Sequence, residues 1–158
     1  MPDSAMNVAN RWLQNLLDPA VVNEVVAPDA TYVSLNTEDE ELMRIMPWTG
    51  TSHGPKAFLD NLGMMFERWE NQAFNVSTMF GSGDNVAIFG DFQYRSQSLD
   101  KIVKSPFSIL LKVADGKVVY LQFLEDSYAT ASSFRKDGSW TIQTEPGAKP
   151  FVVPEDGN

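Results

Sequence analysis

The sequence predicts a single α+β domain in which helices fold against a curved, mainly antiparallel sheet and enclose one pocket. Three observations lead to this class: two short helical segments at the start, a longer helical segment in the middle, and four strand-like segments in succession after residue 74. Runs of helix and then of strand are typical of α+β domains. The length of 158 residues suits one hydrophobic core and is too short for two.

The first part of the chain has the apolar spacing of helices. Val8, Trp12 and Leu16 follow one another at intervals of four, which predicts an amphipathic helix over residues 4–17. A second short helix is expected over residues 20–26, because an Asp-Pro pair precedes it and a proline follows it. The first helix therefore has an apolar face to pack on something larger.

A long connection separates a short strand, residues 31–35, from the main helix. The connection spans residues 36–54; it is acidic at first and then aromatic, and it includes Trp48. Connections of this length are often lids or binding loops, so we expect Trp48 to contact a ligand. The main helix opens at Gly54-Pro55 and has one broad apolar face.

The apolar period changes to that of strands after the main helix. Turn residues separate four expected strands, at residues 74–80, 86–96, 102–113 and 118–126. A terminal helix over 127–135 follows, with Asp126 placed as its N-cap. We expect residues 137–158 to form an extended tail outside a domain of residues 1–136.

The turn at Asp115-Gly116 sets the register of the last two strands. A two-residue loop would pair Ile109 with Gln122, which mixes polar and apolar groups. A three-residue loop with Gly116 in the left-handed region would pair Ile109 with Leu121 and give one continuous apolar face. We choose the second register, because a slip of one residue would turn every side chain to the other face.

Composition and charge exclude several classes of function. Twelve Lys and Arg against twenty-one Asp and Glu give a formal charge of -9, which makes nucleic acid and membrane surfaces poor partners. The chain has no Cys and one His, so a thiolate or His-rich metal site is excluded, and we expect neither a metal nor a cofactor. Without a leader-like or membrane-spanning apolar run, we expect a cytoplasmic protein.

Three segments, in this order, carry a resemblance to a known family: Ala27-Pro-Asp-Ala-Thr-Tyr32, Trp48-Thr-Gly-Thr-Ser-His-Gly-Pro55 and Asp115-Gly-Lys-Val-Val-Tyr-Leu-Gln-Phe-Leu-Glu-Asp-Ser-Tyr. Together they resemble the nuclear transport factor 2-like superfamily, and in particular its SnoaL-like branch. The resemblance covers residues 7–135. It implies a cone-shaped α+β barrel with an interior pocket, a small hydrophobic organic ligand and a homodimer.

The resemblance also implies which strand residues face the pocket. In chain order they are Tyr32, Ser34, Phe89, Asp91, Gln93, Phe107, Ile109, Leu121, Phe123 and Glu125. The family's catalytic sets are incomplete at these positions. Ser34 stands where steroid isomerases of the family have their Asp base, and Phe123 stands where limonene-epoxide-hydrolase-like proteins have an acid. The acid of SnoaL-like polyketide cyclases matches either Phe123 or Glu125, which is displaced by one inward position.

Four of these residues are catalytic candidates. Asp91 is the first choice for proton transfer, because a carboxyl group desolvated in mid-strand has a raised pKa. Tyr32 and Gln93 would hold a substrate oxygen, and Glu125 is a second acid. Whether Glu125 or Asp126 faces the pocket stays open. The expected substrate-binding residues are Ser34, Trp48, Phe89, Phe107, Ile109, Leu121 and Phe123.

Two functions follow from this set. The first is a cofactor-independent acid-base enzyme, such as an isomerase, cyclase or hydrolase, that acts on a hydrophobic oxygenated metabolite. The alternative is a non-catalytic ligand-binding or dimerisation module, which the incomplete catalytic sets favour.

Overall fold

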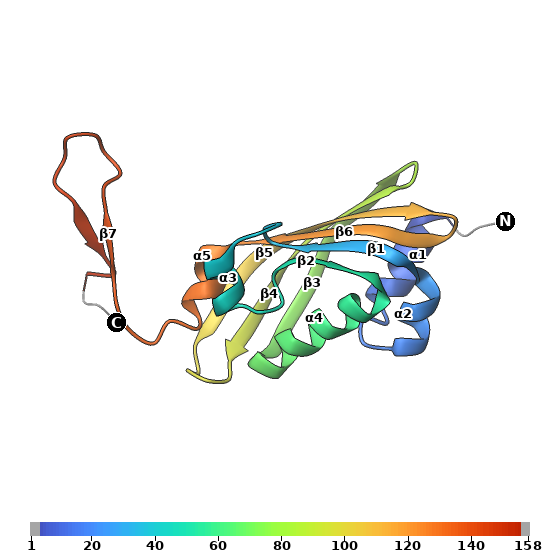
Figure 1. The fold of residues 1–158 in the computed structure, drawn as a ribbon, viewed down its shortest axis with the longest axis horizontal. Coiled ribbons are helices and arrows are strands. Elements are labelled where there is room, and N and C mark those ends of the chain that lie inside the picture. The colour runs from blue at the N-terminus through green and yellow to red at the C-terminus, as the bar shows by residue number, and fades with distance from the viewer. Residues whose placement is uncertain (1–3, 156–158) are drawn as a thin grey trace.

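Six strands form one open, curved sheet in the computed structural model, which describes residues 4–155 (Figure 1). The strand order is β2-β1-β6-β5-β4-β3, and all neighbours are antiparallel except β1 and β6, which run parallel. The strands are β1 (Val26–Ser34), β2 (Gly50–His53), β3 (Trp69–Ser82), β4 (Asn85–Ser96), β5 (Ile102–Ala114) and β6 (Lys117–Glu125).

Helices α1, α2 and α4 lie against one face of this sheet (Figure 1). Side-chain caps begin four of the helices, and Asp126 caps α5 by accepting a hydrogen bond from the backbone N–H of Ala129 at 3.0 Å, as its position in the sequence predicts. The helices are α1 (Ala5–Leu13), α2 (Pro19–Val25), α3 (Glu40–Ile45), α4 (Gly54–Arg68) and α5 (Ser127–Ser132).

Aromatic side chains fill the space between the helices and the sheet. Trp69 is fully buried and stacks on Phe134, with the ring centroids 5.2 Å apart. Its indole N–H donates to the Ser133 hydroxyl at 3.0 Å. This contact holds the C-terminal end of α5 against the core.

The α+β class and the curved, mainly antiparallel sheet are confirmed, although the sheet is open and not a closed barrel. Sequence periodicity missed α3 and β2, which lie inside the segment expected as a long connection. It also started the third strand at residue 74, whereas β3 begins at Trp69. After the buried Trp69, residues 70–72 of β3 are polar and exposed because β3 is an edge strand, so they show no apolar alternation.

The β5–β6 hairpin has neither of the two registers considered from the sequence. Its turn is the two-residue Asp115-Gly116, with φ values of 50° and 74°, and a bulge in which Val119 has no partner follows it. Turn and bulge together pair Ile109 with Phe123. The apolar face was predicted correctly, but the pairing is displaced by two residues, and this displacement brings Glu125 opposite Phe107.

The expected tail contains a hairpin, β7 (Trp140–Ile142) and β8 (Phe151–Val153), which projects away from the sheet (Figure 1). The division into residues 1–136 and 137–158 stays a prediction. No helix within residues 4–155 combines the length and the apolar character that crossing a membrane would require.

Candidate functional site

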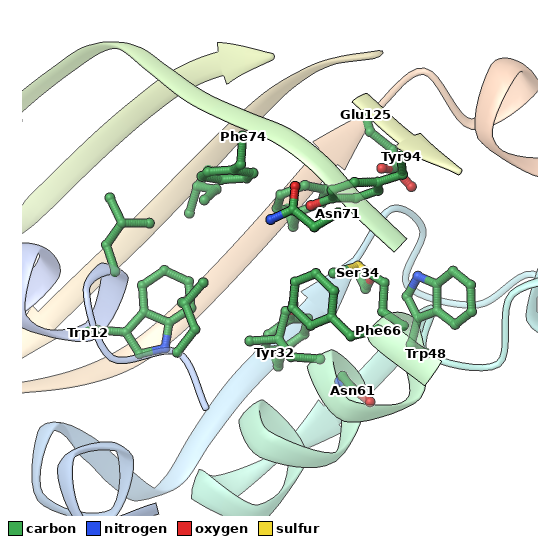
Figure 2. Close-up of a pocket in the computed structure, with 16 residues that line it drawn as sticks. Trp12, Tyr32, Ser34, Trp48, Asn61, Phe66, Asn71, Phe74, Tyr94 and Glu125 are labelled. Atoms are coloured by element: carbon green, nitrogen blue, oxygen red, sulfur yellow. The ribbon is translucent and has the colours of Figure 1, made fainter. Parts of the chain in front are cut away.

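A cavity of about 130 Å³ lies between the helices and the sheet (Figure 2). Its helical side is mostly apolar and includes Trp12, Leu13, Leu16, Leu62, Met65 and Phe66. The residues of the sheet side are Tyr32, Ser34, Asn71, Phe74, Tyr94, Ile109, Phe123 and Glu125, and Trp48 and Asn61 complete the lining.

The polar groups are distributed unevenly around the cavity. Figure 2 shows Glu125 beside Tyr94, with Ser34 and Trp48 toward the same end and Trp12 toward the other. Ser34 lies next to Phe123 because β1 and β6 are parallel neighbours. The cavity therefore has a polar end, where chemistry can occur, and an apolar end that can hold the rest of a ligand.

Glu125 is the carboxyl group of this cavity. It is the last residue of β6 and faces inward opposite Phe107, whereas the side chain of Asp126 is used in capping α5. Burial raises the pKa of Glu125 to about 8; the nearby charge of Asp126 adds to this shift, and a hydrogen bond with Thr130 opposes it. Glu125 is therefore mostly protonated at neutral pH and can act as a proton donor.

Two buried phenols accompany Glu125. Burial raises the pKa of both Tyr32 and Tyr94 above the ordinary value, and the charge of Glu125 contributes to both shifts. Neighbouring rings hold them in place: Tyr32 meets Phe58 edge-on at 4.9 Å, and Tyr94 stacks on Phe92 at 4.3 Å. Both phenols keep their protons over the physiological pH range and can donate hydrogen bonds to a ligand.

Two amide side chains also reach the lining. Asn61 on α4 donates to the hydroxyl of Ser52 at 2.9 Å, which fixes its orientation. Asn71 is the cross-strand partner of Tyr94 and precedes a bulge in β3. Because residues directly opposite on paired strands share a face, this pairing places the Asn71 amide on the same side of the sheet as the Tyr94 ring.

Most of the residues predicted to face the pocket do face it. Six of them line the cavity: Tyr32, Ser34, Trp48, Ile109, Phe123 and Glu125. Phe107 and Leu121 are on the same face but lie in the core behind the lining, where Phe107 stacks on Phe74 at 4.7 Å and on Phe123 at 5.7 Å. The roles assigned to these residues stay predictions.

The placement predicted for Phe89, Asp91 and Gln93 is wrong, because all three are on the outer face of the sheet. Phe89 is 43% exposed and stacks on Phe80. Asp91 accepts a hydrogen bond from the Asn75 amide at 3.1 Å, and Gln93 donates to the Gln72 side chain at 2.7 Å.

Strand pairing explains this correction. Phe107 lies opposite Gly90, and Ile109 lies opposite Ile88. If Phe107 and Ile109 point inward, Ile88 and Gly90 must point inward too, and the alternate positions 89, 91 and 93 must point outward. The buried, inward-facing hydrophobic residues of β4 are Val86, Ile88, Phe92 and Tyr94. Their alternation along the strand is visible in the sequence and could have identified Tyr94 as a residue of the cavity.

Replacing Asp91 with Asn should therefore leave catalysis unchanged. Asp91 is exposed, and its carboxylate contacts only an outer-face amide among the described residues. We expect kcat/KM within twofold of the wild-type value, measured with whatever substrate the wild type converts. A loss of tenfold or more would mean that the outer face takes part in the reaction.

The single histidine lies away from this cavity. His53 is exposed at the start of α4, and its Nδ1 atom is 3.4 Å from the Thr31 hydroxyl. Within the part of the chain that the structure describes, no three His, Cys, Asp or Glu side chains gather closely enough to hold a metal ion.

Comparison with known proteins gives one family. Residues 11–121 match the model of the SnoaL-like domain. Patulin synthesis protein F of Aspergillus clavatus is 39% identical over 125 residues, which are 77% of this chain and 63% of that protein. Patulin biosynthesis cluster protein F of Penicillium expansum is 37% identical over 128 residues, 79% of this chain and 64% of that protein. The chain thus spans less than two thirds of the length of these relatives.

The fold is similar to that of solved structures. An NTF2-like protein of Burkholderia thailandensis superposes with a TM-score of 0.72 at 17% identity, and the match covers 84% of this chain and 98% of that protein. At this identity the likeness concerns the fold alone.

Proposed function

The chain belongs to the SnoaL-like domain family of the NTF2-like superfamily, and on this premise we propose that it is a cofactor-independent enzyme that performs an acid-base step on a small oxygenated metabolite. The observation that carries the proposal is the position of Glu125, whose carboxyl group lines an aromatic cavity together with two buried phenols, where burial raises its pKa to about 8. The names of the two curated relatives support a place in the synthesis of a small molecule.

The proposed reaction step is a proton exchange between a substrate and Glu125. The protonated carboxyl group gives its proton to a carbonyl oxygen, and the resulting carboxylate takes a proton from the adjacent carbon, so Glu125 returns to its first state and the substrate becomes an enol. Tyr94 donates a hydrogen bond to the same oxygen, and Tyr32 is placed to donate to a second oxygen of the substrate. The aromatic walls keep water from the reacting atoms.

A proton-exchange assay tests the proposal without knowledge of the natural substrate. Cyclic ketones and diones of one ring are incubated with the protein in D2O, and loss of the proton signals next to the carbonyl group is followed by NMR. We expect exchange faster than in buffer for at least one compound. Binding of several compounds without exchange or conversion of any would instead support a ligand-binding module.

The exposed outer face of the sheet favours a second candidate, association of two copies as a homodimer. Phe80 and Phe89 stack there while 55% and 43% exposed, and Leu124 is exposed on the same face. Large apolar side chains that gather on a surface often mark a protein interface. Sedimentation of the wild type and of a Phe89→Ser variant would test this, because only the wild type should sediment as a dimer.

The proposed step should also depend on pH in a defined direction. Glu125 must be protonated to begin the step, and burial keeps its proton in place up to a pKa of about 8. We expect kcat/KM to be constant from pH 6 to 7, to fall through half its value near pH 8, and to drop about tenfold per pH unit beyond. A rate that rises from pH 7 to 9 would show that the carboxylate, and not the acid, starts the reaction.

A further inference from the structure

The charge of the cavity restricts what it can bind. None of the described residues that line it is Lys, Arg or His. Arg95, which is on β4, pairs with Glu70 and Asp100 on the outer face, and Lys112 lies over the ring of Tyr120 there. A bound anion would therefore lose its hydration without gaining a positive partner, which is strongly unfavourable.

Hydrogen-bond donors in the lining lack partners. Tyr32, Tyr94 and Trp48 are 5%, 3% and 4% exposed, and among residues 4–155 neither phenol nor the Trp48 indole nitrogen makes a hydrogen bond. The indole N–H of Trp12, at the other end of the cavity, is fully buried and has no partner in that range either. Buried polar groups in proteins are nearly always satisfied. The indole N–H can only donate, and Glu125 donates while it is protonated. The missing partners are therefore acceptors, which a ligand would supply.

The size of the cavity limits the ligand further. About 130 Å³ is close to the volume of a cavity known to hold one benzene-sized ring. Leu13, Phe66 and Phe74 offer apolar surface to the part of the ring that carries no oxygen. A molecule of several fused rings would not fit without movement of the helices.

We propose that this cavity selects an uncharged single-ring molecule that carries at least two hydrogen-bond-accepting oxygens, and that it rejects ions of the same size. One oxygen is held between Glu125 and Tyr94, and another is reached by the Tyr32 phenol or the Trp48 indole. This inference names the ligand class of the proposed enzyme and rests on the same cavity, but it concerns binding and not turnover.

Three probes of similar size separate the alternatives: cyclohexane-1,4-dione, cyclohexanecarboxylate and cyclohexylammonium. Their affinities are measured at pH 7 by NMR titration. We expect the dione to bind at least tenfold more tightly than either ion. Equal affinities, tighter binding of either ion, or no binding of the dione at millimolar concentration would overturn the proposal.

Matched tyrosine variants test the assigned donor. Tyr94→Phe removes one hydroxyl group from the cavity and should weaken dione binding at least fivefold. Tyr120→Phe removes the same group from a ring that lies under Lys112 on the outer face, and it should leave the affinity unchanged. If the two variants bind the dione equally well, Tyr94 is not a ligand donor and the proposed arrangement is wrong.

A third variant distinguishes failure of this inference from failure of the proposed function. Glu125→Gln keeps a hydrogen-bond donor at the polar end but cannot transfer a proton. Under both proposals it binds the dione within threefold of the wild type and catalyses exchange at least about 100-fold more slowly. If the wild type binds the dione selectively but catalyses no proton exchange, only the proposed enzymatic function is refuted. If the wild type catalyses exchange but prefers charged substrates, only the proposed ligand class is refuted.

Discussion

Glu125→Gln is expected to lower the rate of the proposed proton exchange by at least about 100-fold. General acid-base catalysis by a positioned side chain contributes roughly 10²- to 10⁴-fold, and glutamine has the shape of glutamate without its transferable proton. The measurement is the rate of deuterium incorporation, or kcat for an identified substrate, in wild type and variant. Within the described lining there is no second carboxyl group to take over the role.

The neighbouring acid supplies the matched control. Asp126 caps α5, and asparagine caps a helix about as well as aspartate, so Asp126→Asn should keep the fold and most of the activity. If Asp126→Asn loses as much activity as Glu125→Gln, the two carboxyl groups have been assigned the wrong roles. If neither variant loses activity, Glu125 is not the proton carrier.

The stability of Glu125→Gln offers a second test, which does not depend on any substrate. Glu125 keeps its proton in the folded state up to a pKa of about 8, against an ordinary value of 4.5. The group is therefore neutral in both states below pH 4.5, and above that value ionisation favours the unfolded chain by an amount that grows to a few kcal/mol near pH 8. Urea unfolding should show that the free energy of unfolding of Glu125→Gln, relative to that of the wild type, increases from pH 5 to pH 8.

Gly90→Ala is expected to destabilise the protein by more than about 3 kcal/mol and to prevent folding in many conditions. A Cβ atom at this inward position of β4 would lie 1.9 Å from the backbone oxygen of Asn75 and 2.7 Å from the ring of Phe107. The first contact is with backbone on the paired strand β3, so relief requires the two strands to separate.

Another glycine provides the control for this substitution. Gly63 is inside α4, and nothing lies within 4 Å of the Cβ that alanine would add there. Gly63→Ala should stabilise the protein by about 0.5–1 kcal/mol, because alanine is the better helix former. Unfolding curves of both variants check the pair. A Gly90→Ala protein as stable as wild type would contradict the pairing of β3 with β4.

Local patterns in the sequence were sufficient to predict the helices and strands that have clear apolar periodicity. The stripe of Val8 and Trp12 predicted α1, and the Asp115-Gly116 turn predicted the last hairpin. The face of β4 was also readable, from the alternation of Ile88, Phe92 and Tyr94. Following the family resemblance instead of that alternation placed Asp91 in the pocket, since a shift of one residue exchanges the two faces of a strand.

Patterns within a few residues were enough to predict the fold class, the Asp126 cap and the apolar face of the last hairpin. Which acid serves the cavity depends on how distant segments pack together. The bulge at Val119 displaces the register so that Glu125 lies opposite Phe107. Its raised pKa then results from burial by elements distant in the chain, and no local pattern records that environment.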